Sequence, residues 1–195
     1  MPLETVLIVS NRDLNIHLFR RKLIETLLAR NIRVHVSVPD GNYLPQLEKM
    51  GVGVSLYPLA RGSLNPLSVP STLYALRHMI RVINPDVIHS FTHQPNICVR
   101  LASPWPKRVV HTITGLGSAF LRKDIQGTGL RILMSMLYKV TARRCAAMVF
   151  QNDDDRAFFA TRGLIGPARA LCIRGSGVDL KRFRPGLFSS QEVAS

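Results

Sequence analysis

Segments with the pattern of strands alternate with segments with the pattern of helices along this chain. Short apolar runs rich in β-branched residues predict strands, and longer runs with apolar residues at helical spacing predict helices. The predicted strands span 5–10, 33–38, 52–57, 86–89, 108–112, 146–151 and 170–173. The predicted helices span 14–30, 43–50, 66–83, 94–102, 129–144 and 153–162. Such alternation favours crossover connections, so we expect an α/β fold: a single Rossmann-like domain with a parallel, doubly wound sheet.

The composition is that of one globular domain. A chain of 195 residues, 46% of them hydrophobic, can bury a core without disulfides. No apolar run reaches the roughly 18 residues that cross a bilayer, and the first residues do not form a signal peptide. We therefore expect a cytoplasmic protein, with one domain over 1–185 and a frayed tail over 186–195.

Positive charge is concentrated in one part of the chain. The net charge is +14, and residues 100–144 carry nine Lys and Arg residues against one acidic residue, Asp124. Such a field attracts phosphate groups of lipid headgroups, of pyrophosphate-linked substrates or of nucleic acid. The alternative is a solvated basic face without a partner. Nucleic acid is the least favoured ligand, because the chain has few aromatic residues for stacking and no recognised nucleic-acid motif.

An apolar helix bordered by cations lies inside this basic window. Leucine, isoleucine, methionine and valine residues predominate between Leu130 and Val140, and Arg131, Lys139, Arg143 and Arg144 border them. This pattern is typical of a helix that lies at a membrane surface, and also of a core helix beside a sheet. The sequence leaves both interpretations open.

Ligands of open parallel sheets bind beyond the carboxyl ends of the strands. The corresponding segments are 10–15, 39–42, 89–96 and 111–117. The last of these runs into a loop rich in Gly, Thr and Ser, from His111 to Phe120. Its glycines permit close backbone approach, and a helix from about Thr128 would offer its positive N-terminus, so we expect a phosphate cradle. The same glycines could instead serve only a tight turn.

Two classes of cofactor are disfavoured by the motifs that the chain lacks. Its G-x-G elements do not extend to G-x-G-x-x-G, and it has no P-loop or H-E-x-x-H pattern. His89 and His93 have no third metal ligand nearby in the sequence. We expect no cofactor and no metal site. His111, at a strand end, could bind a sugar hydroxyl or serve as a structural group.

Several pieces of the sequence together resemble the N-terminal domain of family-four glycosyltransferases of the GT-B class. They are Ser10-Asn11 with Phe19-Arg20, Asn84 to His89, Phe91 to Asn96, Thr112 to Phe120, and Gly175 to Asp179. The chain is most similar to the subgroup of undecaprenyl-diphosphate-linked N-acetylgalactosaminyltransferases. One departure is Gln94, where relatives commonly have lysine before Pro-Asn.

The resemblance implies the acceptor-side half of an enzyme that transfers a sugar from a nucleotide sugar to a polyprenyl-diphosphate-linked glycan. In this family the second domain binds the donor and carries the E-x7-E carboxylates. The chain ends ten residues after Pro185. We therefore expect it to be inactive alone, to pair with a separate C-terminal donor-binding domain, and to lie peripherally at the inner face of the cell membrane, whose surface is anionic.

The resemblance also implies a set of site residues. His111 is the candidate catalytic residue. The candidate acceptor-binding residues are Asn11, Arg20, His93, Asn96, Thr114, Gly115, Gly117, Arg122 and Lys123. A non-catalytic domain that docks on a membrane or a partner, as part of a truncated or split glycosyltransferase, is the alternative.

Overall fold

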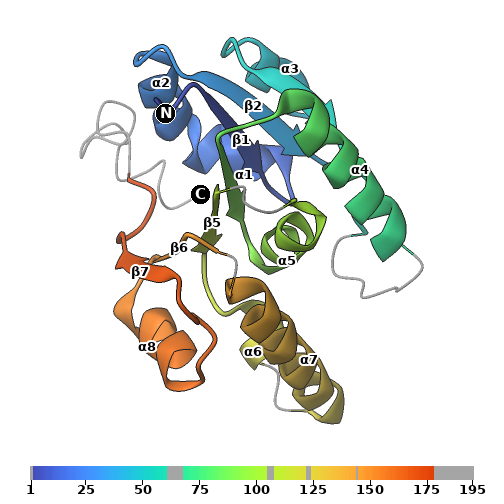
Figure 1. Cartoon of the computed structure of the whole chain (residues 1–195), viewed down its shortest axis with the longest axis vertical. Helices are drawn as coiled ribbons and strands as arrows, with labels where there is room; N and C mark the ends of the chain where they lie inside the picture. Colours follow the sequence, from blue (N-terminus) through green and yellow to red (C-terminus); the bar gives the residue numbers. More distant parts are fainter. Residues whose placement is uncertain (1, 61–67, 105–107, 122–123, 144, 178–195) are drawn as a thin grey trace, which may run out of the picture.

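The computed structural model of the chain describes residues 2–60, 68–104, 108–121, 124–143 and 145–177 (Figure 1). Seven parallel strands form one sheet in the order β3-β2-β1-β4-β5-β6-β7. The strands are β1 (Thr5–Val9), β2 (Arg33–Val38), β3 (Gly53–Leu56), β4 (Val87–Phe91), β5 (Arg108–Ile113), β6 (Ala147–Phe150) and β7 (Arg169–Cys172). The predicted α/β, Rossmann-like fold with a parallel sheet is confirmed.

Helices connect the strands in the manner expected of a doubly wound fold. They are α1 (Asp13–Phe19), α2 (Arg21–Leu28), α3 (Leu44–Glu48), α4 (Val69–Ile83), α5 (His93–Ala102), α6 (Gly117–Leu121), α7 (Ile125–Ala142) and α8 (Asp153–Thr161). The predicted tail and the end of the predicted domain lie beyond residue 177, outside the described residues.

The apolar side chains of β1 divide between the two faces of the sheet. Val6 and Ile8 pack with residues of α1, α2 and α3, whereas Leu7 and Val9 pack with residues of α4 and α5. A third cluster joins α6, α7 and α8 to β5 and β6 (Figure 1). Because successive side chains of a strand point to opposite faces, one continuous apolar run such as TVLIV supplies both layers.

Two local predictions differ from the structure. The helix predicted over 14–30 is broken at Arg20, whose backbone leaves the helical region at φ −121° and ψ 0°. Apolar residues keep the helical period across the break, so the sequence pattern cannot reveal it. The glycine-rich segment predicted as a loop over 113–127 contains the short helix α6.

A buried carboxylate fixes two loops at the carboxyl ends of β1 and β2. Asp13 accepts hydrogen bonds from the backbone amides of Leu14, at 2.8 Å, and Tyr43, at 2.6 Å. A β-carbon built on Gly41 would overlap the Asp13 carboxylate. The loop after β2 can therefore pass over Asp13 only because residue 41 has no side chain.

Gly41→Ala is therefore expected to destabilise the fold by about 1–3 kcal/mol, because the added methyl group displaces the Asp13 carboxylate or the backbone. Gly129→Ala is the matched control, since no atom lies within 4 Å of the added β-carbon and alanine favours the α7 helix. The free energy of unfolding in urea measures both. A Gly41→Ala variant as stable as Gly129→Ala would contradict this packing.

Candidate functional site

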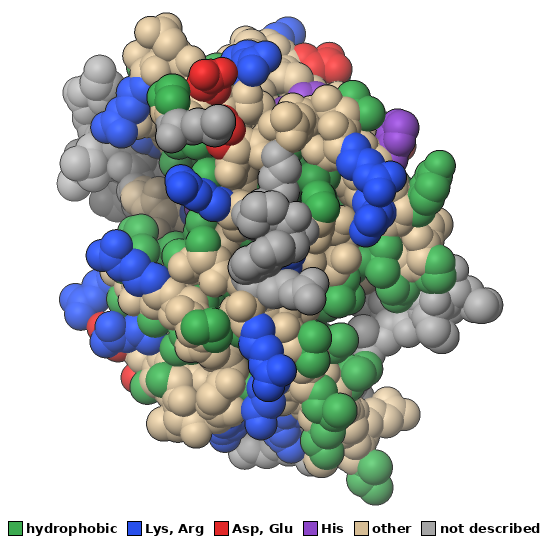
Figure 2. Space-filling model, in the orientation of Figure 1, with side chains coloured by type: hydrophobic (Ala, Val, Ile, Leu, Met, Phe, Trp, Pro, Cys, Tyr) green, Lys and Arg blue, Asp and Glu red, His purple; other side chains and the backbone are tan. Residues whose placement is uncertain are grey.

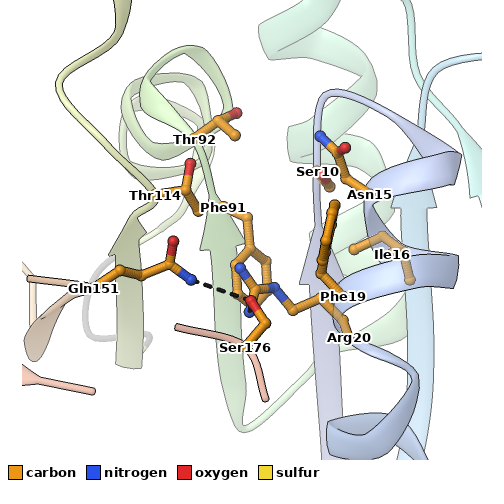
Figure 3. Close-up of a pocket in the computed structure, with 10 residues that line it drawn as sticks. All are labelled: Ser10, Asn15, Ile16, Phe19, Arg20, Phe91, Thr92, Thr114, Gln151 and Ser176. Carbon is orange, nitrogen blue, oxygen red and sulfur yellow. Dashed lines mark hydrogen bonds between the residues drawn. The ribbon is translucent and has the colours of Figure 1, made fainter. Parts of the chain in front are cut away.

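A pocket of about 300 Å³ opens at the carboxyl ends of β1 and β4 (Figure 3). At this point the strand order reverses, because β1 lies between β2 and β4. One wall carries Ser10, Asn15, Ile16, Phe19 and Arg20, the other carries Thr92, Thr114, Gln151 and Ser176, and Phe91 lies between them at the floor. Ligands of open α/β sheets bind at such a switch point, so this pocket is the candidate site.

A second hollow, of about 630 Å³, lies at the opposite end of the sheet. It is lined by Thr5, Arg33 and Gly53, which begin β1, β2 and β3 or flank them, and by Val82 and Ile83 of α4. It is larger and more open, but it lies at the amino ends of the strands. The position of the first pocket, rather than size, decides which of the two is the candidate functional site.

Arg20 is the cationic group of the pocket. Its guanidinium lies over the ring of Phe91, 4.3 Å from the centroid, and Nη1 donates a 2.9 Å hydrogen bond to the Ser176 hydroxyl. Burial lowers the pKa of Arg20 to about 10, so the group remains charged at neutral pH. No described carboxylate forms an ion pair with it. A half-buried cation of this kind is suited to an anionic ligand.

Ser176 joins the two walls of the pocket. Its hydroxyl oxygen accepts hydrogen bonds from Arg20 and from the Gln151 amide, the latter at 3.2 Å. Figure 3 shows Gln151 and Arg20 approaching this hydroxyl from opposite sides. Because both lone pairs of the oxygen are engaged, its own hydrogen is the group left to donate to a ligand.

Thr92 has a strained backbone at the edge of the pocket. It adopts φ 71° and ψ 160°, a combination that is essentially restricted to glycine. The strand end holds it there, because its amide donates to the Thr112 carbonyl and its carbonyl accepts from the Asn96 amide. Strain of this kind costs about 1–3 kcal/mol and clusters at functional sites.

Beneath the pocket, a buried polar network joins β4, α5 and β5. The Ser90 hydroxyl donates to Asn96 Oδ1 at 2.7 Å, and Asn96 Nδ2 donates to the Thr112 carbonyl at 3.2 Å. Because the one hydrogen of Ser90 is used, His111 Nδ1, 2.7 Å from the Ser90 oxygen, must be the donor in that contact. Asn96 therefore cross-links the strand ends from inside.

His111 has no exposed surface. Burial, and then the charges of Arg100 and His89, lower its pKa to about 3, so its ring is neutral at physiological pH. Direct contact with an acceptor would require the strand ends to open. The catalytic role of His111 stays a prediction, and the geometry shows it as part of the internal network.

His89, on the neighbouring strand β4, is also neutral at physiological pH. Its Nε2 lies 2.7 Å from the Thr112 hydroxyl and its ring stacks on Phe91, with 4.2 Å between the centroids. Burial, followed by the charge of Arg20, lowers its pKa to about 3. His89 and Phe91 thus form the floor on which the Arg20 guanidinium rests.

The predicted loop after β5 has the backbone that its glycines permit. Gly115 has φ +140° and Gly117 has φ +61°, both unfavourable for other residues. Thr114 is exposed and lines the pocket, which places the start of this loop at the site. The helix predicted from about Thr128 is α7, which begins at Ile125 and follows the short helix α6. The Asp124 carboxylate caps α7 by accepting a hydrogen bond from the Gly127 amide.

The predicted acceptor-binding residues fall into several groups. Arg20 and Thr114 line the pocket. Asn11 does not line it, and its Oδ1 accepts a hydrogen bond from Asn15, which does. Asn96 belongs to the buried network, and both ring nitrogens of His93 have partners within the protein. Gly115 and Gly117 continue the loop from Thr114. Arg122 and Lys123 lie outside the described residues.

Sequence analysis missed Gln151 and Ser176. They follow β6 and β7, so the rule that ligands bind at the carboxyl ends of strands would have found them had it been applied to those two strands. In the described part of the chain, no cluster of three His, Cys, Asp or Glu side chains could hold a metal ion. None of the helices that the structure describes is both long and apolar enough to span a bilayer.

Comparisons with known proteins agree with this architecture. The solved structures that share the fold include a sucrose-phosphate synthase from Thermosynechococcus elongatus, with a TM-score of 0.68 and 15% identity; the match covers 93% of this chain and 50% of that chain. They also include a glycosyltransferase from Rickettsia africae, with a TM-score of 0.62 and 14% identity; the match covers 100% of this chain and 48% of that chain. At such identities the likeness shows the fold alone.

Sequence comparison is more specific. A Campylobacter jejuni protein, N,N'-diacetylbacillosaminyl-diphospho-undecaprenol alpha-1,3-N-acetylgalactosaminyltransferase, is 29% identical over 187 residues. The match covers 94% of this chain and 49% of that protein, so the chain spans about half the length of this relative. The family described as Glycosyltransferase Family 4 matches residues 21–182, well over half of the chain. The protein therefore belongs to glycosyltransferase family 4.

Proposed function

We propose that this chain is the acceptor-side half of a glycosyltransferase that transfers a sugar from a nucleotide sugar to a polyprenyl-diphosphate-linked glycan. The observation that carries the proposal is Arg20, a charged, half-buried guanidinium in the pocket at the switch point. The Campylobacter jejuni relative is named for an undecaprenyl-diphospho acceptor, which supports a diphosphate as the anionic partner of Arg20.

The pocket offers groups for both parts of such an acceptor. Arg20 and the Ser176 hydroxyl would hold the diphosphate, with a charge-assisted hydrogen bond as the strongest contact. Asn15 and Thr114 are short polar side chains that suit the hydroxyl groups of a sugar. Fixing the acceptor hydroxyl in one orientation is the contribution that this half would make to transfer.

One wall of a cleft is not sufficient for the reaction. A donor-binding domain would supply the contacts to the nucleotide sugar. The same contacts would supply most of the stabilisation of the charge that develops in the transition state. We infer that the 195 residues alone do not transfer sugar, and that binding of the acceptor, rather than turnover, is the appropriate measurement on this chain.

The outer face of α7 fits a membrane surface, where a lipid-linked acceptor is found. Ile125, Ile132, Met136 and Val140 recur on one side of the helix and are 92%, 57%, 61% and 63% exposed. Figure 2 shows apolar side chains gathered at the lower right, over α7, with basic side chains beside them. Both interpretations of this helix therefore apply, each to a different face. The inner face packs in the core, and the outer face suits a bilayer interface.

The α7 face also favours a second candidate function, a domain that docks on membranes without handling an acceptor. The two functions differ in the pocket. An acceptor-binding protein needs Arg20, whereas a docking domain needs only the α7 face and its neighbouring cations, among them Lys139 and Arg143. The next two experiments separate them.

Arg20→Met is expected to weaken binding of a short-chain polyprenyl-diphosphate sugar by about ten-fold or more, because a charge-assisted hydrogen bond is lost while the length of the side chain is kept. Isothermal titration of the purified chain measures this affinity. Arg162→Met is the matched control, since Arg162 also lies over a phenylalanine ring, that of Phe158, but outside the pocket. Equal affinities of the two variants would contradict the proposed diphosphate site.

The chain is expected to bind vesicles that contain phosphatidylglycerol more strongly than vesicles of phosphatidylcholine, and less strongly as salt rises, because each Lys or Arg near an anionic surface contributes about 1 kcal/mol. Co-sedimentation measures binding. Ile132→Glu should weaken it, whereas Val82→Glu, at a 70% exposed apolar position on α4, should not. Equal binding to both kinds of vesicle, or equal effects of the two variants, would count against docking through α7.

A further inference from the structure

His93 lies where three elements meet: the first turn of α5, the loop after β5, and α7. Its Nδ1 is 2.8 Å from the Tyr138 hydroxyl of α7. Its Nε2 is 2.9 Å from the carbonyl oxygen of Gly115 and 2.9 Å from that of Leu116. One imidazole ring therefore connects a helix with two consecutive peptide groups of the loop.

The partners determine which ring nitrogen carries the hydrogen. A carbonyl oxygen can only accept, so Nε2 must carry the hydrogen that is shared between Gly115 and Leu116. In the neutral ring Nδ1 is then an acceptor, and the Tyr138 hydroxyl donates to it. Burial lowers the pKa of His93, although the two carbonyls and Asp155 oppose this effect, so the ring is neutral at physiological pH.

Aromatic rings hold the imidazole in this orientation. Phe159 is nearly parallel to it, at an interplanar angle of 4° and a centroid distance of 6.3 Å, and Tyr138 meets it edge-on at 84°. Phe120 of α6 lies 5.3 Å away, between centroids. The ring is thus fixed by Tyr138 of α7 and Phe159 of α8, which lie outside the loop that it contacts, and by Phe120 of α6, which directly follows that loop.

The two carbonyl contacts decide where the loop amides point. In a trans peptide the C=O of one residue and the N–H of the next point in opposite directions. With both carbonyls turned toward His93, the amides of Leu116 and Gly117 are turned away from it. Among the described residues neither amide has a hydrogen-bond acceptor. Successive free amides of this kind attract anions.

We propose that His93 is the positioning residue of the acceptor loop: it ties the Gly115 and Leu116 carbonyls to Tyr138 of α7 and so presents the loop amides to the acceptor. This inference rests on the proposed function, because the loop amides have an acceptor to bind only if the chain binds one. His93 then serves the acceptor without touching it. The position of α7, whose outer face fits a membrane, therefore affects how firmly the loop is held, because Tyr138 of α7 contacts His93 and His93 contacts the loop.

The order parameters of the Gly115, Leu116 and Gly117 amides, measured by ¹⁵N NMR relaxation on the isotopically labelled 195-residue chain, test this positioning. Tyr138→Phe removes the hydroxyl that donates to His93 Nδ1 and should lower the order parameters of these loop amides, because the His93 ring is then held by fewer contacts. Thr141→Val is the matched control: it removes a buried hydroxyl of α7 that bonds within the helix, to the Leu137 carbonyl, and should leave the loop unchanged.

A second pair of variants tests the Nε2 hydrogen itself. His93→Met and His93→Gln have side chains of similar length, but only glutamine can donate to the Gly115 and Leu116 carbonyls. The order parameters of the loop amides should be lower in the methionine variant than in the glutamine variant. The ¹⁵N NMR spectrum of the wild-type chain should show the hydrogen of the His93 ring on Nε2.

Binding of a short-chain polyprenyl-diphosphate sugar separates this inference from the function on which it rests. Affinity should fall several-fold in Tyr138→Phe and stay unchanged in Thr141→Val. Unchanged loop order parameters in a folded Tyr138→Phe variant, or a hydrogen on Nδ1, would overturn the positioning role. Lower loop order parameters in Tyr138→Phe together with no binding by the wild-type chain would support the positioning role and overturn the proposed function. If His93→Met does not fold, Tyr138→Phe decides.

Discussion

The parallel pairing of β1 with both β2 and β4 is the constraint on which the rest of the molecule depends. Val6 to Val9 have strand partners on both sides, in β2 and in β4. The chain therefore winds outward from β1 in both directions, which leaves a gap between the loops after β1 and β4. Phe91 closes the floor of that gap and Arg20 lies over it. The pocket is a consequence of the topology, and the side chains supply its charge.

Rigid support and local strain meet at the end of β4. Ser90, Asn96 and His111 are fully buried and hydrogen-bonded in series, which ties β4 and β5 to α5. That network is adjacent to Thr92, which stays in an unfavourable backbone conformation at the rim of the pocket. Strain persists only where the surrounding contacts enforce it. The buried network supplies such contacts, so stability of the interior is linked to the shape of the site.

The apolar pattern of the sequence was sufficient to predict the strands, because buried parallel strands are continuous apolar runs and each run here is followed by a turn. The break at Arg20 escaped detection because the apolar period of α1 continues into α2. Two of the residues that the resemblance suggests for acceptor binding, Arg20 and Thr114, line the pocket, and their role there stays a prediction. His93 and Asn96 could not be assigned from sequence, because a polar residue at a strand end gives no sign of whether it faces ligand or interior.

The central claim is that the pocket at the switch point binds a diphosphate-linked acceptor. NMR of the isotopically labelled chain, titrated with a short-chain polyprenyl-diphosphate sugar, tests it most directly. The account predicts the largest shift changes at Thr92, Thr114, Gln151 and Ser176, around the pocket. Arg33 and His35, in the hollow at the amino ends of the strands, should stay unchanged. Changes centred on that hollow, or no changes at all, would contradict the account.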